Sequence, residues 1–171
     1  MKKATNSIYK KAITITLLFM AVMVSSLRGQ SVNFTGSYQI SETKTDFGDA
    51  PHSVLPAKLT ISQLKDRLTV QRITVDSNKQ ETVNSETLKF DGSKTETTLK
   101  SGNKRTASLK GSANQNSFTI DSRSVTPDGK LNTQINETWT LEADGKTLVL
   151  TRQVEQGNGL KYTIKGYYDR Q

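Results

Sequence analysis

The segment from Leu131 to Tyr168 constrains the fold more than any other part of the chain. A largely apolar set (Leu131, Thr133, Ile135, Glu137, Trp139 and Leu141) alternates with Asn, Gln and Thr, and this period of two predicts a strand with one buried face. Asp144-Gly145 favours a tight hairpin turn, so a second strand should run back antiparallel. The turn would oppose four pairs on one side of the sheet: Leu141 with Leu148, Trp139 with Leu150, Glu137 with Arg152, and Ile135 with Val154.

Further strands are predicted on both sides of this hairpin. After Gly157-Asn158-Gly159, a third strand should bury Leu160, Tyr162, Ile164, Gly166 and Tyr168. Near the start, Phe34, Gly36, Tyr38 and Ile40 form the buried face of a first strand. Strands at 58–63 and 67–75 would pair about Lys65-Asp66, with Ile61 opposite Val70 and Leu59 opposite Arg72. Candidates at 80–90, 94–100, 104–110 and 116–125 carry few apolar residues, so their register is weakly specified.

Short loops join about ten predicted strands, and helix-type periodicity is nearly absent. A sheet of this size normally curls or closes, because closure removes its exposed edges. The sequence therefore predicts an all-β, antiparallel up-and-down meander that forms a closed or partly open barrel. In a closed barrel, residues near Gly36 should pair with residues near Ile164. The longest unpatterned stretch, 41–57, is expected to be a lid or a span across an open end.

Residues 1–29 have the three parts of an export signal: a basic leader from Met1 to Lys11, an apolar run from Ala12 to Val24, and a processing region that ends at Gly29. The apolar run is shorter than the about 20 residues that a membrane-spanning helix needs. We therefore expect cleavage after Gly29 or after Ser26, and a periplasmic or extracellular domain over 30–171 with no stable membrane insertion. The sequence contains no cysteine, so neither a lipoprotein anchor nor a disulfide is expected.

The formal net charge of +8 is concentrated in the predicted signal. Five positive charges lie there, on Lys2, Lys3, Lys10, Lys11 and Arg28, and no acidic residue precedes Glu42. The remaining domain is therefore nearer +3, which is an ordinary solvated surface. No nucleic-acid partner is expected.

Five short motifs are spread over the expected domain: Phe34-Thr35-Gly36-Ser37-Tyr38, Asp46-Phe47-Gly48, Glu137-Thr138-Trp139-Thr140-Leu141, Asp144-Gly145-Lys146-Thr147-Leu148 and Tyr167-Tyr168-Asp169. Together they resemble a group of small secreted lipocalin-like, or calycin-like, proteins of Bacteroidota. Gly36-Ser37-Tyr38 is also similar to the Gly-x-Trp signature of lipocalins, with Tyr38 in place of the Trp. The lipocalin Thr-Asp-Tyr signature and cysteine pair are lacking, and the strand count is nearer that of fatty-acid-binding proteins. The resemblance implies a barrel with a cavity and identifies no ligand.

Glu137 opposite Arg152 is the most informative chemical feature. A directly opposed cross-strand ion pair contributes roughly 0.2 to 1 kcal/mol. Moving each ion into a dry interior costs several kcal/mol, so water or further polar groups should reach the pair. One interpretation is a wet cavity in which Arg152 binds a ligand's carboxylate or phosphate and Glu137 is its resting partner. The other is a structural clamp in which Arg152 stacks on an aromatic ring and fixes the register.

The candidate ligand-binding residues are therefore Arg152, Glu137, Trp139, Tyr38, Tyr162 and Arg72, and Arg123 is a further candidate for either arrangement. No catalytic, metal or cofactor site is predicted. His52 is the only histidine and no nucleophile elbow accompanies it. Asp46-Phe47-Gly48 matches the metal-binding tripeptide of protein kinases without their other signatures. Asp46 and Asp49 are expected to cap turns rather than bind calcium.

Two functions lead, both non-catalytic, and an enzyme is a distant third. The first is an exported barrel that binds a small hydrophobic or amphipathic ligand in its interior, beneath the loop at 41–57. The second is a non-catalytic envelope or extracellular structural module with a filled core and a protein partner that the sequence does not identify. A gap beside Glu137 and Arg152, lined by Trp139, Tyr38, Phe34, Tyr162 and Tyr168, would favour the first. Interlocked packing of the same side chains would favour the second.

Overall fold

A computed structural model describes residues 32–48, 50–111 and 115–171, and the predicted signal at 1–29 lies outside them. None of the helices in this part is long and apolar enough to cross a membrane. The described residues form one short 3-10 helix, η1 (His52–Val54), and ten strands. The strands are β1 (Gly36–Ile40), β2 (Lys58–Gln63), β3 (Arg67–Val75), β4 (Glu81–Lys89), β5 (Thr95–Thr98), β6 (Lys104–Gly111), β7 (Ser117–Val125), β8 (Leu131–Leu141), β9 (Thr147–Gln156) and β10 (Lys161–Arg170).

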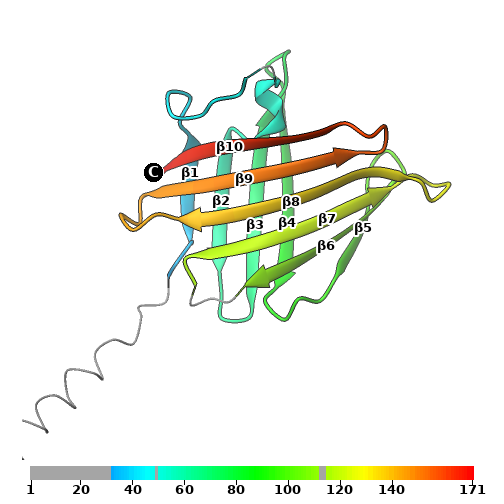
Figure 1. The fold of residues 1–171 in the computed structure, drawn as a ribbon. Coiled ribbons are helices and arrows are strands. Elements are labelled where there is room, and N and C mark those ends of the chain that lie inside the picture. The colour runs from blue at the N-terminus through cyan, green and yellow to red at the C-terminus, as the bar shows by residue number, and fades with distance from the viewer. Residues whose placement is uncertain (1–31, 49, 112–114) are drawn as a thin grey trace, which may run out of the picture. The chain divides into compact units, whose positions relative to one another are not determined.

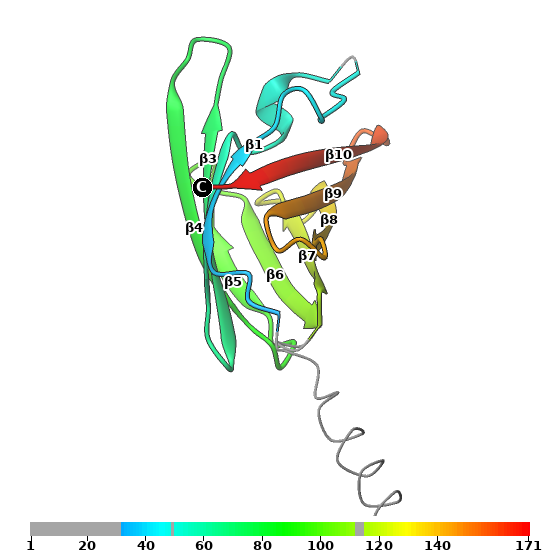
Figure 2. The ribbon, with the colours of Figure 1, turned by 90° about the vertical axis from the view of Figure 1, so that its left-hand side faces the viewer.

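The ten strands form one antiparallel sheet in the order β4-β3-β2-β1-β10-β9-β8-β7-β6-β5. Consecutive strands pair with one another except for β4 and β5, and β1 also pairs with β10 (Figure 1). The sheet curls so that β3 and β4 face β6 to β10 across the interior (Figure 2). The predicted all-β meander is confirmed as a nearly closed barrel. Its one break lies between β4 and β5, which are not hydrogen-bonded neighbours; we call this break the seam.

The turn of the β8–β9 hairpin is stabilised by hydrogen bonds between the Asp144 side chain and backbone N–H groups of the turn. The Asp144 carboxylate accepts hydrogen bonds from the N–H groups of Lys146 (2.8 Å) and Thr147 (3.0 Å), and Gly145 adopts a positive φ of 66°. All four predicted pairs are present in the β8–β9 register. The predicted pairs of Ile61 with Val70 and of Leu59 with Arg72 are also confirmed. The strands predicted between 80 and 125 match β4 to β7 closely.

Two details of the predicted register are wrong. The first and last strands do pair, but Ile40 lies opposite Tyr168 and Tyr38 opposite Arg170, rather than Gly36 opposite Ile164. This register brings the Arg170 guanidinium onto the Tyr38 hydroxyl, at 2.9 Å. Leu160 is not buried: it is 53% exposed, because its backbone closes the β9–β10 turn through a hydrogen bond from Gln156.

The barrel interior has an apolar half and a polar half. The paired inward positions of β3 and β4 change from apolar to polar along the strands. Leu68 lies opposite Leu88, and two pairs further along Arg72 lies opposite Asn84. In the apolar half, the Phe118 ring packs edge-on against Phe34 at 4.8 Å and stacks on Trp139 at 5.6 Å. The fully buried side chains that fill this half include Tyr38, Leu59, Leu109, Leu148 and Tyr168.

The loop at 41–57 is fastened to the barrel at its C-terminal end. Leu55 is 1% exposed, the Tyr168 hydroxyl donates to the Pro56 carbonyl at 3.0 Å, and the Arg152 guanidinium donates to the Val54 carbonyl. Gly166 makes room for Leu55, because a Cβ there would lie 2.8 Å from the leucine methyl. The described part of the loop therefore contributes to the core.

Candidate functional site

Glu137 of β8 is the centre of a buried ion network. Its side chain is 6% exposed, and it accepts four hydrogen bonds from three residues. Arg152 donates its Nε (2.8 Å) and one terminal nitrogen (2.5 Å) to Oε1, as expected from the opposed positions of the two residues. Arg72 (3.0 Å) and the indole of Trp139 (3.2 Å) donate to Oε2. Both carboxylate oxygens are thus satisfied, which a buried charge requires.

The network keeps Glu137 ionised. Burial alone would raise the pKa of its carboxyl, but the guanidinium groups of Arg72 and Arg152 lower that pKa to about 2. Glu86 follows the same pattern: burial opposes ionisation, and Arg72 with Arg105 lowers its pKa below the ordinary value. Both carboxylates therefore remain negative over the physiological pH range.

The network crosses the barrel from one wall to the other. Arg72 of β3 bridges Glu137 of β8 and Glu86 of β4, and Arg105 of β6 donates to Glu86 at 2.8 Å. We call Arg72, Glu86, Arg105, Glu137 and Arg152 the charge cluster. The Arg105–Glu86 contact joins β6 to β4, so it spans the seam where backbone pairing stops.

The charge cluster is not internally balanced, since three guanidinium groups face two carboxylates. Arg72 lies over the Trp139 ring at 5.4 Å, a cation–π contact. Its Nε is buried and has no hydrogen-bond partner in the described part of the chain. A buried guanidinium nitrogen without a partner is unusual, because every such donor normally finds an acceptor. The charge cluster thus has one more positive than negative group, and the Arg72 Nε is a donor without an acceptor among the described residues.

An interior pocket of about 310 Å³ adjoins the charge cluster at the seam. Its walls come from both edges of the sheet, β4 and the end of β5, and from β3 and β6 to β9. Besides the cluster residues, the lining residues are Asn84, Ser85, Thr97, Leu99, Ser122 and Ile135. No described residue of the loop at 41–57 lines this pocket. The sequence predicted a ligand site beneath that loop, whereas the pocket lies at the seam.

The predicted site residues divide into three groups. Arg152, Glu137, Arg72 and Trp139 come together in or against the charge cluster. Tyr38 lies apart from it: its hydroxyl donates to the Phe34 carbonyl at 2.8 Å and accepts from Arg170. Tyr162 pairs with Val154 near the start of β10 and does not line the interior pocket, and Arg123 is exposed on the outer face of β7.

The Glu137–Arg152 pair has packed aromatic rings on one side and a pocket on the other. The aromatic residues Trp139, Tyr38, Phe34 and Tyr168 are buried, Tyr162 is partly exposed, and none of the five lines the interior pocket. A pocket nevertheless adjoins Glu137 and Arg152 on the polar side. The ring that a guanidinium covers is Trp139, and the guanidinium is that of Arg72 rather than Arg152.

Glu86 and Arg105 are functional candidates that were not predicted. The alternation of inward and outward residues along a strand could have indicated them. Glu86 lies two residues before the buried Leu88, and Arg105 lies four residues before the buried Leu109, so both face inward. Both residues lie in strands with few apolar residues, where the sequence alone does not indicate which face is buried.

Neither a family model nor a curated protein matches this sequence.

Within the described residues, no group of His, Asp and Glu side chains is arranged to hold a metal ion. His52 stacks on Phe47 at 4.1 Å and pairs with Glu42 at 3.2 Å on the exposed side of the loop. The arrangement beside the interior pocket is chemically suited to anion binding, because it presents guanidinium donors.

Proposed function

We propose that this protein is an exported, non-catalytic lipocalin-like barrel that binds a small amphipathic acid in the pocket beside the charge cluster. The observation that carries the proposal is the imbalance of three guanidinium groups over two carboxylates around a pocket of about 310 Å³. A ligand carboxylate or phosphate would neutralise the excess charge. Guanidinium groups are well suited to bind such anions through paired, charge-assisted hydrogen bonds.

The lining also supports a limit on the size and polarity of the ligand. Leu99 and Ile135 supply partly exposed apolar contact next to the arginines. The apolar half of the barrel is occupied by Phe34, Phe118 and Trp139, so a long alkyl chain has no space there. A compact aromatic or short aliphatic acid fits these features better than a long-chain fatty acid or a sterol.

Export rests on the sequence of residues 1–29, which has the composition of a signal peptide. The protein would then reside in the periplasm or outside the cell, and the lack of cysteine argues against a lipid anchor. The motifs that resemble small secreted lipocalin-like proteins of Bacteroidota support the same placement.

Two measurements test ligand binding. Native mass spectrometry of the protein purified from its own envelope should detect a retained small anion. Titration of residues 30–171 with benzoate, phenyl phosphate and octanoate should change Trp139 fluorescence, because Arg72 contacts both the pocket and the indole ring. Ser122→Leu should abolish the response by filling the pocket while leaving the charge cluster intact. Ser62→Leu, at an exposed position of β2, is the matched control and should respond like the wild type.

The filled apolar half favours the second candidate, a non-catalytic envelope or extracellular interaction module. The same measurements separate the two functions. A protein that carries no anion and whose fluorescence responds to none of the three acids would reject the ligand-binding proposal in favour of the module.

A further inference from the structure

The outer face of β6 to β10 carries two rows of polar side chains that the interior pocket does not use. The cross-strand register aligns one residue from each strand in each row. The first row is Ser108, Asp121, Asn136, Gln153 and Thr163, and the second is Thr106, Arg123, Gln134, Glu155 and Lys161. We call these residues the outer rows.

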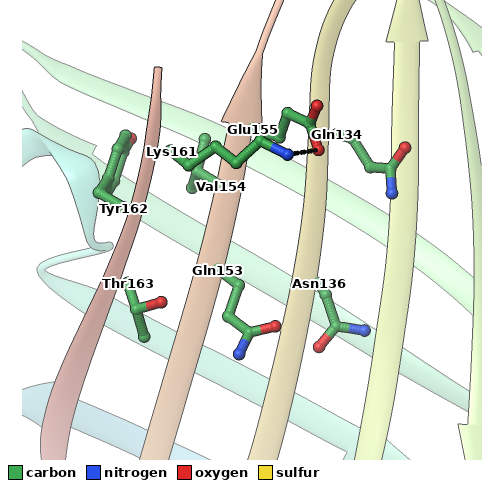
Figure 3. Close-up of a pocket in the computed structure, with 8 residues that line it drawn as sticks. All are labelled: Gln134, Asn136, Gln153, Val154, Glu155, Lys161, Tyr162 and Thr163. Atoms are coloured by element: carbon green, nitrogen blue, oxygen red, sulfur yellow. Dashed lines mark ion pairs between the residues drawn. The ribbon is translucent and has the colours of Figure 1, made fainter. Parts of the chain in front are cut away.

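Two hollows follow the outer rows and join into one groove. A hollow of about 370 Å³ lies over β8 to β10, and another of about 710 Å³ extends over β6 to β9. Both are lined by Gln134, Asn136 and Gln153, so the two hollows meet at β8 and β9. Figure 3 shows these three amides on the same side of the sheet, with Thr163 beyond them on β10. The groove therefore runs across the strands.

The amide groups of Gln134 and Gln153 are available for a ligand. Neither makes a hydrogen bond to any described residue, and both are exposed. A carboxamide donates and accepts, which matches sugar hydroxyls that also do both. Neighbouring strands lie about 4.8 Å apart, close to the repeat of one sugar in an extended chain. Each strand thus offers polar side chains to about one sugar.

The charges of the groove indicate which sugars fit. Asp121 is paired with Lys110 at 2.5 Å, and Glu155 with Lys161 at 3.1 Å. Arg123 and the nearby Lys94 have no carboxylate partner among the described residues, so the β6–β7 end of the groove has unbalanced positive charge. We infer that the outer rows bind an oligosaccharide that carries carboxylate groups, with the amides on its hydroxyls and Arg123 on a carboxylate.

Calorimetric titration with short galacturonate chains tests this inference, and short cellulose chains of equal length serve as the neutral probe. We expect galacturonate to bind and the neutral chains to bind at least about tenfold more weakly. Gln134→Ala, Gln153→Ala and Arg123→Ala should each weaken galacturonate binding about fivefold to tenfold. These positions are exposed, so the variants should fold, as circular dichroism would verify.

Gln71→Ala on β3 and Lys58→Ala on β2 are the matched controls, because both are exposed positions on strands that do not carry the outer rows. They should leave the affinity unchanged. The inference is overturned if galacturonate does not bind, if the neutral chains bind equally well, or if Lys58→Ala weakens binding as much as Arg123→Ala. The last result would indicate attraction by net charge rather than a site.

Discussion

Arg152 of β9 donates two hydrogen bonds to a single oxygen of Glu137, the residue directly opposite it on β8. A third donor nitrogen of the same guanidinium reaches the carbonyl of Val54, the last residue of η1. One side chain therefore connects the hairpin, the charge cluster and the loop that packs on the barrel.

Arg152→Met should destabilise the fold by about 3 to 5 kcal/mol, because it removes a partner of a buried carboxylate that remains charged. Denaturant unfolding measures this loss. Arg67→Met removes an exposed arginine paired with Asp66 and should cost at most about 1 kcal/mol. Adding Glu137→Gln to Arg152→Met should recover part of the lost stability, since the buried charge that has lost one of its two arginine partners is then removed. Equal effects of the two single arginine variants would contradict the buried network.

Acid should weaken the fold through Glu137. Its pKa is about 2 in the folded state and 4.5 ordinarily, so its stabilising effect is complete above about pH 4.5 and is lost as the pH falls toward about 2. The difference between these two pKa values corresponds to about 3 kcal/mol of unfolding free energy. Unfolding free energies measured across this range should fall more steeply for the wild type than for Glu137→Gln. Glu142→Gln, at an exposed position, should keep the wild-type slope.

Arg105→Ala should loosen the seam. The change removes the contact between β6 and Glu86 of β4 while leaving Glu86 bonded to Arg72. We expect hydrogen exchange to accelerate in β5 and at the β4 edge, with an overall loss of only about 1 to 2 kcal/mol, because the Arg105 side chain is 26% exposed. Lys104→Ala is the matched control on the outer side of β6. Unchanged exchange in β5 would show that the contact does not hold the edges together.

Tyr38→Phe should cost about 1 to 3 kcal/mol, because it removes a buried hydroxyl that donates to the Phe34 carbonyl and accepts from Arg170. Thermal or denaturant unfolding measures the change. Tyr167→Phe is a suitable control, since Tyr167 is only partly buried and its ring contact with Lys165 does not need the hydroxyl. Similar losses for both variants would contradict a specific role for the Tyr38 hydroxyl.

The sequence predicted the elements of the fold that depend on local pattern. The alternation around Trp139 and the Asp144-Gly145 turn determine which residues of β8 and β9 meet, so Glu137 and Arg152 were correctly paired. The β1–β10 register was not predictable in this way, because no turn links the two strands. It depends on tertiary contacts such as that between Tyr38 and Arg170.

The candidate site was predicted only in its local part. Arg72 and Glu137 are far apart in the sequence, and nothing local indicates that they meet across the barrel at 3.0 Å. Glu86 and Arg105 were missed because their strands have weak apolar alternation. Tyr38 was grouped with the site because aromatic residues were expected to line one cavity, whereas Tyr38 packs against Phe34 and Arg170 instead.

The seam gives this barrel a mechanical freedom that a fully hydrogen-bonded cylinder lacks. Between β4 and β5 no row of backbone hydrogen bonds has to break when the wall spreads, and among the described residues the Arg105–Glu86 ion pair links the two sides of the seam. The circumference of the barrel can therefore change at the seam while every hydrogen-bonded pair of strands keeps its register.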